Sequence, residues 1–319
     1  MGLFEFNDKL NNAIIGVAVF MFILHLIILM VARLNPEKNY TNIKQRMNSW
    51  WFMMAFLALI FIGNTIIGLV LVGVLSFLAL CEFYAMVQFD PSDRWLVRLS
   101  FLAIPAQLYF IYIDWIGTFY LFVPLYMFFL LPIGRIFSGN TKDFIKTIGI
   151  IQWGLLLNVY CIGYLGAYLT PYLGQTIAPI SLNGKEVLLF LLIVNTGNDA
   201  AQYFWGKSLG KSKIVPGISP NKTWAGFWGG VCTTTVVASL LSFVLMPIPW
   251  YYAAAAGLMI AVFGFVGDVT MSAVKRDVGV KDSSNLIPGH GGVLDRLDSL
   301  TYSAPLLFHF ICFFFQNFN

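Results

Sequence analysis

Apolar stretches long enough to cross a lipid bilayer fill most of this 319-residue chain. A helix that crosses a bilayer needs roughly 20 predominantly apolar residues, and ten such stretches can be placed along the sequence. They lie near residues 13–32, 50–67, 68–88, 99–113, 115–133, 147–169, 187–206, 224–246, 250–274 and 299–318. The sequence therefore predicts an all-α polytopic membrane protein with about ten transmembrane helices.

Composition excludes a soluble domain. Only 11% of the residues are charged, whereas a soluble domain has about a quarter. The four cysteines lie far apart, each inside an apolar stretch, so no thiolate metal site and no disulfide is expected. Two pairs of stretches are close enough in sequence to be tight hairpins, with turns predicted at Gly68 and Asp114.

Lysine and arginine gather in alternate loops, which predicts the orientation. The loops at 33–48, 89–98, 134–146, 207–223 and 275–296 contain 17 of the 19 lysines and arginines, and only Lys9 and Lys185 fall on the other side. We therefore expect these loops to face the cytoplasm and both termini to lie outside. The sequence is divided into an N-terminal transmembrane region, 1–134, and a C-terminal transmembrane catalytic region, 135–319, in which we expect a polar cleft facing the cytoplasm.

The segment from 268 to 298 carries the densest group of ionisable residues, with five aspartates, two lysines, two arginines and a histidine. Ionisable residues in a membrane protein usually mark its working site. Asp268, Ser272 and Lys275 are spaced to share one helix face, and Asp295 and Asp298 would do so if that part is helical. Asp298 can also be read simply as a helix cap.

A second polar loop follows the seventh stretch. Asp199 lies inside the membrane boundary, where it is a functional candidate or a carboxylate paired only for structure. Prolines at 216 and 220 exclude a continuous helix. Lys222, with Ser219, Asn221 and Thr223 beside it, stands at the start of the eighth stretch, which is typical of a phosphate site. The alternative is an ordinary basic loop.

Together these two loops resemble the phosphatidate cytidylyltransferases, also called CDP-diacylglycerol synthases. The similarity is strong over about 190–300 and weaker before it, where Arg46, Glu82 and Ser49-Trp50-Trp51 are comparable pieces. Two departures, Gln202 and Ala225, leave the fine substrate preference open. The matching positions of the second loop are Ser272, Lys275, Arg276, Lys281, Asp282, Pro288, His290, Gly291, Gly292, Asp295, Arg296 and Asp298. Those of the first are Asp199, Tyr203, Gly206, Gly210, Lys211 and residues 218–224.

The resemblance implies transfer of a cytidylyl group from CTP to phosphatidic acid, with release of pyrophosphate. Aspartates can hold Mg²⁺, alone or with a second cation, and basic side chains can neutralise phosphate oxygens. The expected catalytic residues are Asp199, Lys275, Arg276, Lys281, His290 and Arg296. The expected nucleotide and phosphate contacts are Ser219, Asn221, Lys222, Thr223 and Ser272. The expected metal ligands are Asp268, Asp282, Asp295 and Asp298.

The expected partners are CTP, phosphatidic acid and the lipid bilayer, without nucleic acid, and the resemblance also implies a homodimer. The expected location is the bacterial inner membrane. Three other interpretations are considered. A CDP-alcohol phosphotransferase is disfavoured because the chain has no Asp-Gly dipeptide. A membrane prenyltransferase would have paired aspartate-rich motifs, which Asp199 and Asp268 barely match. An ion-coupled transporter would favour inverted repeats and midplane sites, and no repeat is evident.

Overall fold

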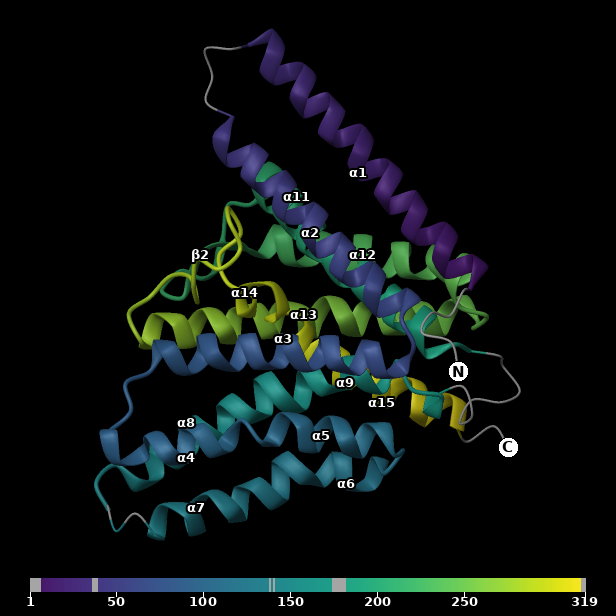
Figure 1. The fold of residues 1–319 in the computed structure, drawn as a ribbon. Helices are drawn as coiled ribbons and strands as arrows, with labels where there is room; N and C mark the ends of the chain where they lie inside the picture. Colours follow the sequence, from purple (N-terminus) through teal and green to yellow (C-terminus); the bar gives the residue numbers. More distant parts are fainter. Residues whose placement is uncertain (1–6, 36–39, 138, 140, 174–181, 317–319) are drawn as a thin grey trace.

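The chain folds into long helices that run between two ends of the molecule (Figure 1). This is a computed structural model that describes residues 7–35, 40–137, 139, 141–173 and 182–316. Six of the predicted stretches are single helices: α1 (Asp8–Leu34), α2 (Thr41–Ile62), α3 (Thr65–Met86), α11 (Gly184–Leu209), α12 (Trp224–Leu245) and α13 (Trp250–Asp277).

The other four stretches are each built from shorter pieces. These are α4 (Arg94–Ser100) with α5 (Ala103–Tyr112), α6 (Ile116–Leu121) with α7 (Phe128–Phe137), α8 (Phe144–Leu155) with α9 (Ile162–Ala167), and α14 (Leu294–Leu297) with α15 (Leu300–Gln316). A single 3₁₀ turn, Pro91–Asp93, precedes α4, and π-helical segments at Phe122–Met127 and Leu156–Cys161 join α6 to α7 and α8 to α9. In the described part of the chain, eight helical spans are long and apolar enough to cross a membrane. The all-α polytopic membrane fold is confirmed.

The turn between α2 and α3 is not where the sequence predicted it. It lies at Gly63 and Asn64, and the Asn64 side chain caps α3 by accepting a hydrogen bond from the Ile67 amide at 3.0 Å. Gly68 lies inside α3, where a Cβ atom would come 2.6 Å from a methyl group of Leu169. Its small size serves helix packing rather than a turn. The turn at Asp114 is confirmed, with φ of 60° between α5 and α6.

One short hairpin interrupts the helices between α11 and α12. Strands β1 (Lys213–Val215) and β2 (Ser219–Thr223) pair antiparallel, with Val215 opposite Ser219. The turn contains Pro216 and Gly217. Proline has no backbone N–H to donate, so a helix could not continue through this segment. Thr223 ends β2 and caps α12, since its Oγ1 accepts a hydrogen bond from the Gly226 amide at 3.1 Å. The chain is thus turned directly into the next helix.

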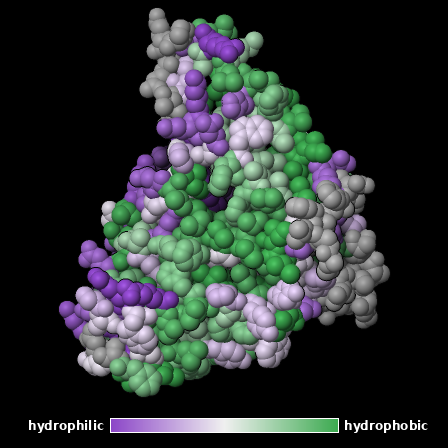
Figure 2. Space-filling model, in the orientation of Figure 1, coloured by the Kyte–Doolittle hydropathy of each residue, from purple (hydrophilic) through white to green (hydrophobic). Residues whose placement is uncertain are grey.

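The two ends of the helices differ in polarity. In Figure 1 the hairpin and the turns that follow α3 and α13 lie on the left, while the start of α1 and the end of α15 lie on the right. Figure 2 shows hydrophilic atoms along the left edge and apolar atoms over the middle. It also shows a hollow with hydrophilic residues in its depth, near the place where α2 passes α13 and α14. The basic loops therefore gather at one end of an apolar body.

A buried ion pair holds the lower layer of the N-terminal half together. Arg135 of α7 and Asp93, each 1% exposed, form this pair, and Asp93 also accepts a hydrogen bond from Thr147 Oγ1 at 3.3 Å. The pair joins α4, α7 and α8 and lies apart from the polar residues of the C-terminal half. It is a structural feature of the helix packing.

Candidate functional site

The site begins where the hairpin meets α13. Lys222 of β2 forms an ion pair with Asp268 of α13, and its Nζ donates to the Gln202 side-chain oxygen of α11 at 3.4 Å. Asp268 also accepts a hydrogen bond from Ser272 Oγ, one turn later, at 3.4 Å. The two predicted loops, more than 40 residues apart, are therefore in contact through Lys222 and Asp268.

Arg276 fixes the hairpin against the end of α13. Its Nε donates to the Ile218 carbonyl at 3.3 Å and its Nη1 donates to the Val280 carbonyl at 2.9 Å. The guanidinium is exposed at the end of the helix. Arg276 therefore joins the two loops to each other in this structure, and its remaining donors face outward.

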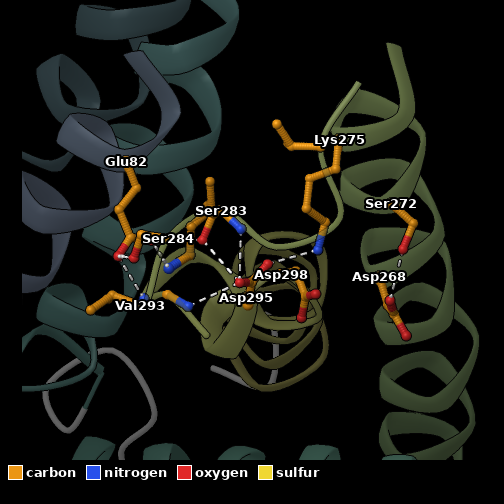
Figure 3. A network of polar contacts seen from close by, with 12 residues as sticks. Glu82, Asp268, Ser272, Lys275, Ser283, Ser284, Val293, Asp295 and Asp298 are labelled. Carbon is orange, nitrogen blue, oxygen red and sulfur yellow. Dashed lines mark hydrogen bonds and ion pairs between the residues drawn. The ribbon is translucent and has the colours of Figure 1, made fainter. Parts of the chain in front are cut away.

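Asp295 lies at the centre of the second loop and is surrounded by donors (Figure 3). Lys275 Nζ donates to Oδ1 at 2.7 Å. The backbone amides of Ser283 and Gly292 each donate to Oδ2 at 2.9 Å, and Ser283 Oγ lies 3.0 Å from the same oxygen. Both Asp295 and Lys275 are buried. Because hydrogen bonds to charged groups are the strong ones, this carboxylate organises the loop around itself.

Asp298 and Asp199 face each other across Ser299. The Ser299 hydroxyl lies 3.3 Å from Asp298 Oδ1 and 3.4 Å from Asp199 Oδ2, and its amide donates to Asp298 Oδ1 at 2.8 Å. Asp298 also interacts electrostatically with Asp268 and Lys275. The break between α14 and α15 falls at Asp298 and Ser299, so the helix face predicted for Asp295 and Asp298 is interrupted by a kink in which Asp298 is buried.

The glycine-rich turn before α14 is braced by α2. Gly289 and Gly291 have φ of 74° and 80°, a conformation that only glycine adopts easily. Arg46 Nε donates to the Gly289 carbonyl at 3.0 Å, and Ser49 Oγ donates to the Pro288 carbonyl at 2.8 Å. Helix α2 therefore helps to hold the turn at 288–291, although the two are about 240 residues apart in the sequence.

His290 projects from this turn against Trp50, with the two rings edge to face and their centroids 6.0 Å apart. Its Nδ1 is buried and has no hydrogen-bond partner among the described residues. Desolvation lowers the pKa of His290 below 6.5, and the positive charges of Arg296 and Arg46 lower it further. These surroundings disfavour the protonated form of the imidazole.

Most of the remaining predicted residues have exposed side chains. The side chains of Asn221, Lys281, Asp282 and Arg296 are exposed, and Ser219 is half-exposed. Thr223 is buried and used as a helix cap. Asp199 is exposed despite its place inside α11, which is expected if it lines an open cleft. The structure thus separates framework residues, chiefly Asp295 and Thr223, from residues with free polar groups.

Two participants were not assigned from the sequence. Glu82 of α3 accepts hydrogen bonds from the second loop, although no role in the site was predicted for it from the sequence. Ser283, at a position that the motif does not fix, contacts both Glu82 and Asp295. The sequence signals for Glu82 were its place within a transmembrane stretch and a weak family resemblance. Neither could show its partners, which lie about 200 residues later.

The donor set fits a magnesium ion only in combination with substrate. No group of three or more His, Cys, Asp or Glu side chains in the described ranges is arranged to hold a metal. Mg²⁺ commonly takes only one or two carboxylates and completes its shell with water and substrate phosphates. Asp268 and Asp298 suit that role, because Asp268 is held only by side chains and Asp298 Oδ2 has no protein donor among the described residues. Asp295 would have to exchange its present partners.

Comparison with known proteins shows the family of the chain. The family model described as "Cytidylyltransferase family" matches residues 44–314. A protein of *Escherichia coli* strain K12, "Uncharacterized protein YnbB", is 38% identical over 276 residues, which cover 86% of this chain and 89% of the relative. A phosphatidate cytidylyltransferase of *Bacillus subtilis* is 32% identical over 266 residues, covering 81% and 94%.

A shorter match covers less than half of the chain. A phosphatidate cytidylyltransferase of *Brucella suis* is 43% identical over 128 residues, which cover 40% of this chain and 47% of the relative. The family match includes both polar loops, the brace from α2 and the Glu82 position. This chain belongs to the cytidylyltransferase family.

Proposed function

We propose that this protein transfers a cytidylyl group from CTP to phosphatidic acid, giving CDP-diacylglycerol and pyrophosphate. The observation that supports it best is the meeting of the Lys222 hairpin with the Asp268–Asp298 segment at one end of an apolar helical body. Phosphate-binding cations and carboxylates are thus placed where a lipid headgroup and a soluble nucleotide can meet. Membership of the cytidylyltransferase family supports the same reaction.

The reaction requires no nucleophile from the protein. A phosphate oxygen of the lipid attacks the α-phosphorus of CTP, the bond between that phosphorus and the α–β bridging oxygen breaks, and pyrophosphate leaves with the bonding electrons. The lipid phosphate is already ionised near neutral pH. Catalysis then depends on positioning and on neutralising charge as it moves to the leaving group.

Each group of residues has a role in this proposal. Lys222, with Ser219 and Asn221, binds nucleotide phosphates at the start of α12, where the helix N-terminus also favours anions. The exposed cations Lys281 and Arg296 neutralise lipid phosphate and pyrophosphate, as do the outward donors of Arg276. Lys275 holds Asp295, and Ser272 orients Asp268. In its neutral form, His290 offers one N–H donor and one acceptor nitrogen.

Magnesium is the expected cofactor, held by Asp268 and Asp298, with Asp199 and Asp282 as the next carboxylates. When bound, it would neutralise phosphate oxygens and align the nucleotide. The site is proposed to face the cytoplasm, where CTP is present and where basic loops are retained. The lipid would enter sideways from the bilayer. A homodimer stays a prediction from the family resemblance.

The test is pyrophosphate release by purified protein with CTP, phosphatidate vesicles and Mg²⁺. We expect release to require all three, and a labelled cytidylyl group to appear in the lipid. CTP is compared with UTP, and phosphatidate with other lipid phosphates. Transfer only to another lipid phosphate would change the substrate but keep the reaction class. Absence of transfer to any of them, with intact folded protein, would reject the proposal and favour a transport function.

A further inference from the structure

Glu82 connects the N-terminal half of the chain to the signature loop. It lies four residues before the end of α3 and is only 7% exposed. A carboxylate in a membrane helix is costly unless its oxygens find partners. Four donors supply them: Ser283 Oγ at 2.8 Å, Ser284 Oγ at 2.7 Å, and the amides of Val293 and Leu294 at 2.9 Å each.

Ser283 links Glu82 to Asp295 (Figure 3). Its hydroxyl lies within hydrogen-bond distance of Glu82 Oε2 and of Asp295 Oδ2, and its amide donates to Asp295. A Cβ atom at Gly292 would lie 2.1 Å from Ser283 Oγ and 2.3 Å from Glu82 Oε2. The loop therefore packs so closely against Glu82 and Ser283 that no side chain fits at position 292.

Asp295 connects the loop held by Glu82 to the residues of the site. It is paired with Lys275 of α13, and Asp298 follows it by three residues at the kink before α15. The amides of Val293 and Leu294, which donate to Glu82, lie at the start of α14, the helix that contains Asp295. A shift of the loop away from Glu82 would thus move Asp295, its lysine partner and Asp298 together.

We propose that Glu82 is a positioning residue that holds this loop in the geometry required for cytidylyl transfer. The inference rests on the proposed function for its kinetic readout. Glu82 contacts no substrate in this role, and it acts through Ser283, Asp295 and Asp298. Its partners in the described residues are neutral donors rather than lysine or arginine. The role therefore depends on two acceptor oxygens.

Glu82→Gln tests that requirement at nearly constant volume. In either orientation, the new amide NH₂ faces a backbone N–H, of Val293 or of Leu294, and that hydrogen bond is lost. We expect kcat to fall roughly 10- to 100-fold, on the scale of hydrogen bonds to a charged group. KM for CTP should change by less than about threefold, because the Lys222 hairpin is untouched. Glu82→Asp keeps both oxygens and should recover part of the rate.

Limited trypsin digestion gives a readout that does not depend on activity. Lys281 is exposed within the loop, so release of the loop in Glu82→Gln should speed cleavage after this residue. Asp93→Asn is the matched control, because it removes another buried carboxylate whose partners, Arg135 and Thr147, lie outside the loop. It should lower the Tm while leaving both kcat per folded molecule and cleavage at Lys281 unchanged.

The outcomes separate the two proposals. Unchanged kcat and unchanged cleavage in Glu82→Gln would overturn the positioning role, as would equal kcat losses in Glu82→Gln and Asp93→Asn. A wild-type protein that transfers no cytidylyl group would reject the proposed function instead. The digestion would then still decide whether Glu82 holds the loop.

Discussion

At the scale of single residues, the carboxylates of the site fall into two kinds. Asp295 is enclosed by Lys275, two backbone amides and a hydroxyl. Asp298 keeps an oxygen without a protein donor in the described part of the chain, and Asp268 is held by side chains that can move away. The first kind maintains the loop, and the second is available to a metal ion and its phosphates.

Asp268→Asn and Asp298→Asn should therefore abolish turnover without unfolding the protein. We expect kcat to fall by at least roughly 100-fold, as when a group that stabilises transition-state charge is removed. Pyrophosphate release at increasing Mg²⁺, with Tm measured in parallel, checks this. Asp295→Asn should lower the Tm as well, because it breaks the Lys275 pair. Full activity in Asp268→Asn or Asp298→Asn would remove that residue from the site.

Lys222→Ala tests nucleotide binding. Loss of a charge-assisted contact to phosphate should weaken CTP binding by about 1.5–3 kcal/mol, measured by calorimetry without lipid. Its ion pair with Asp268 is partly exposed, so little stability should be lost. Lys213→Ala is the control, an exposed lysine on the other strand of the same hairpin. Equal losses in the two variants would indicate general charge attraction, and unchanged CTP binding with impaired lipid use would assign Lys222 to the lipid.

At the scale of elements, the close approach of α13 to the kink before α15 determines the site geometry. A Cβ atom at Gly267 would lie 2.5 Å from the backbone oxygen of Asp298. Gly149 of α8, by contrast, has nothing within 4 Å of such an atom. Two helical glycines therefore offer a matched pair, one at the site and one away from it.

Gly267→Ala should push α13 away from Asp298. We expect a loss of about 1–3 kcal/mol of stability from overpacking, together with a several-fold lower kcat. Gly149→Ala should be neutral or stabilising by about 0.5–1 kcal/mol, because alanine loses less backbone entropy than glycine in a helix. Thermal unfolding in detergent and pyrophosphate release check both. Equal behaviour of the two variants would contradict the role of this contact.

The sequence predicted elements well and their junctions less well. Ten apolar stretches correspond to the helical segments because lipid burial imposes length and apolarity. The α2–α3 turn was misplaced because Gly68 was taken as a turn signal, whereas Asn64 supplies the cap. Local patterns could not show that Gly68 faces Leu169 of a distant helix.

The candidate site shows the same division. The sequence indicated Asp268, Lys275, Asp295 and Lys222 as site residues, because each lies in a short polar motif whose residues are close together in the chain. It could not separate Asp295, which is fully engaged, from Asp298, because that difference depends on backbone amides of the folded loop. The contribution of Glu82 was hidden for a related reason, since its hydrogen bonds bridge about 200 residues.

At the scale of the whole molecule, the architecture requires both polar loops to lie on one side of the membrane. Lys222 contacts Asp268, and Arg276 contacts the hairpin, so residues 207–223 and 275–296 share one end of the helices. The connection between α12 and α13 lies at the opposite end. The excess of lysine and arginine in the loops at this end, which include 207–223 and 275–296, predicts that this end is cytoplasmic.

Cysteine labelling in intact cells tests this orientation. With Cys81, Cys161, Cys232 and Cys312 replaced, single cysteines are placed at Ser212, Asn285 and Pro247, which are all exposed. Ser283 and Ile248 are unsuitable because both are buried. A membrane-impermeant thiol reagent should label only the cysteine at position 247, and permeabilisation should expose the other two. Labelling of both loops from outside would invert the orientation but keep one site, because both loops would still share a side. Labelling of only one loop would place Lys222 and Asp268 on opposite sides of the bilayer, which no single site for CTP and lipid phosphate could accommodate.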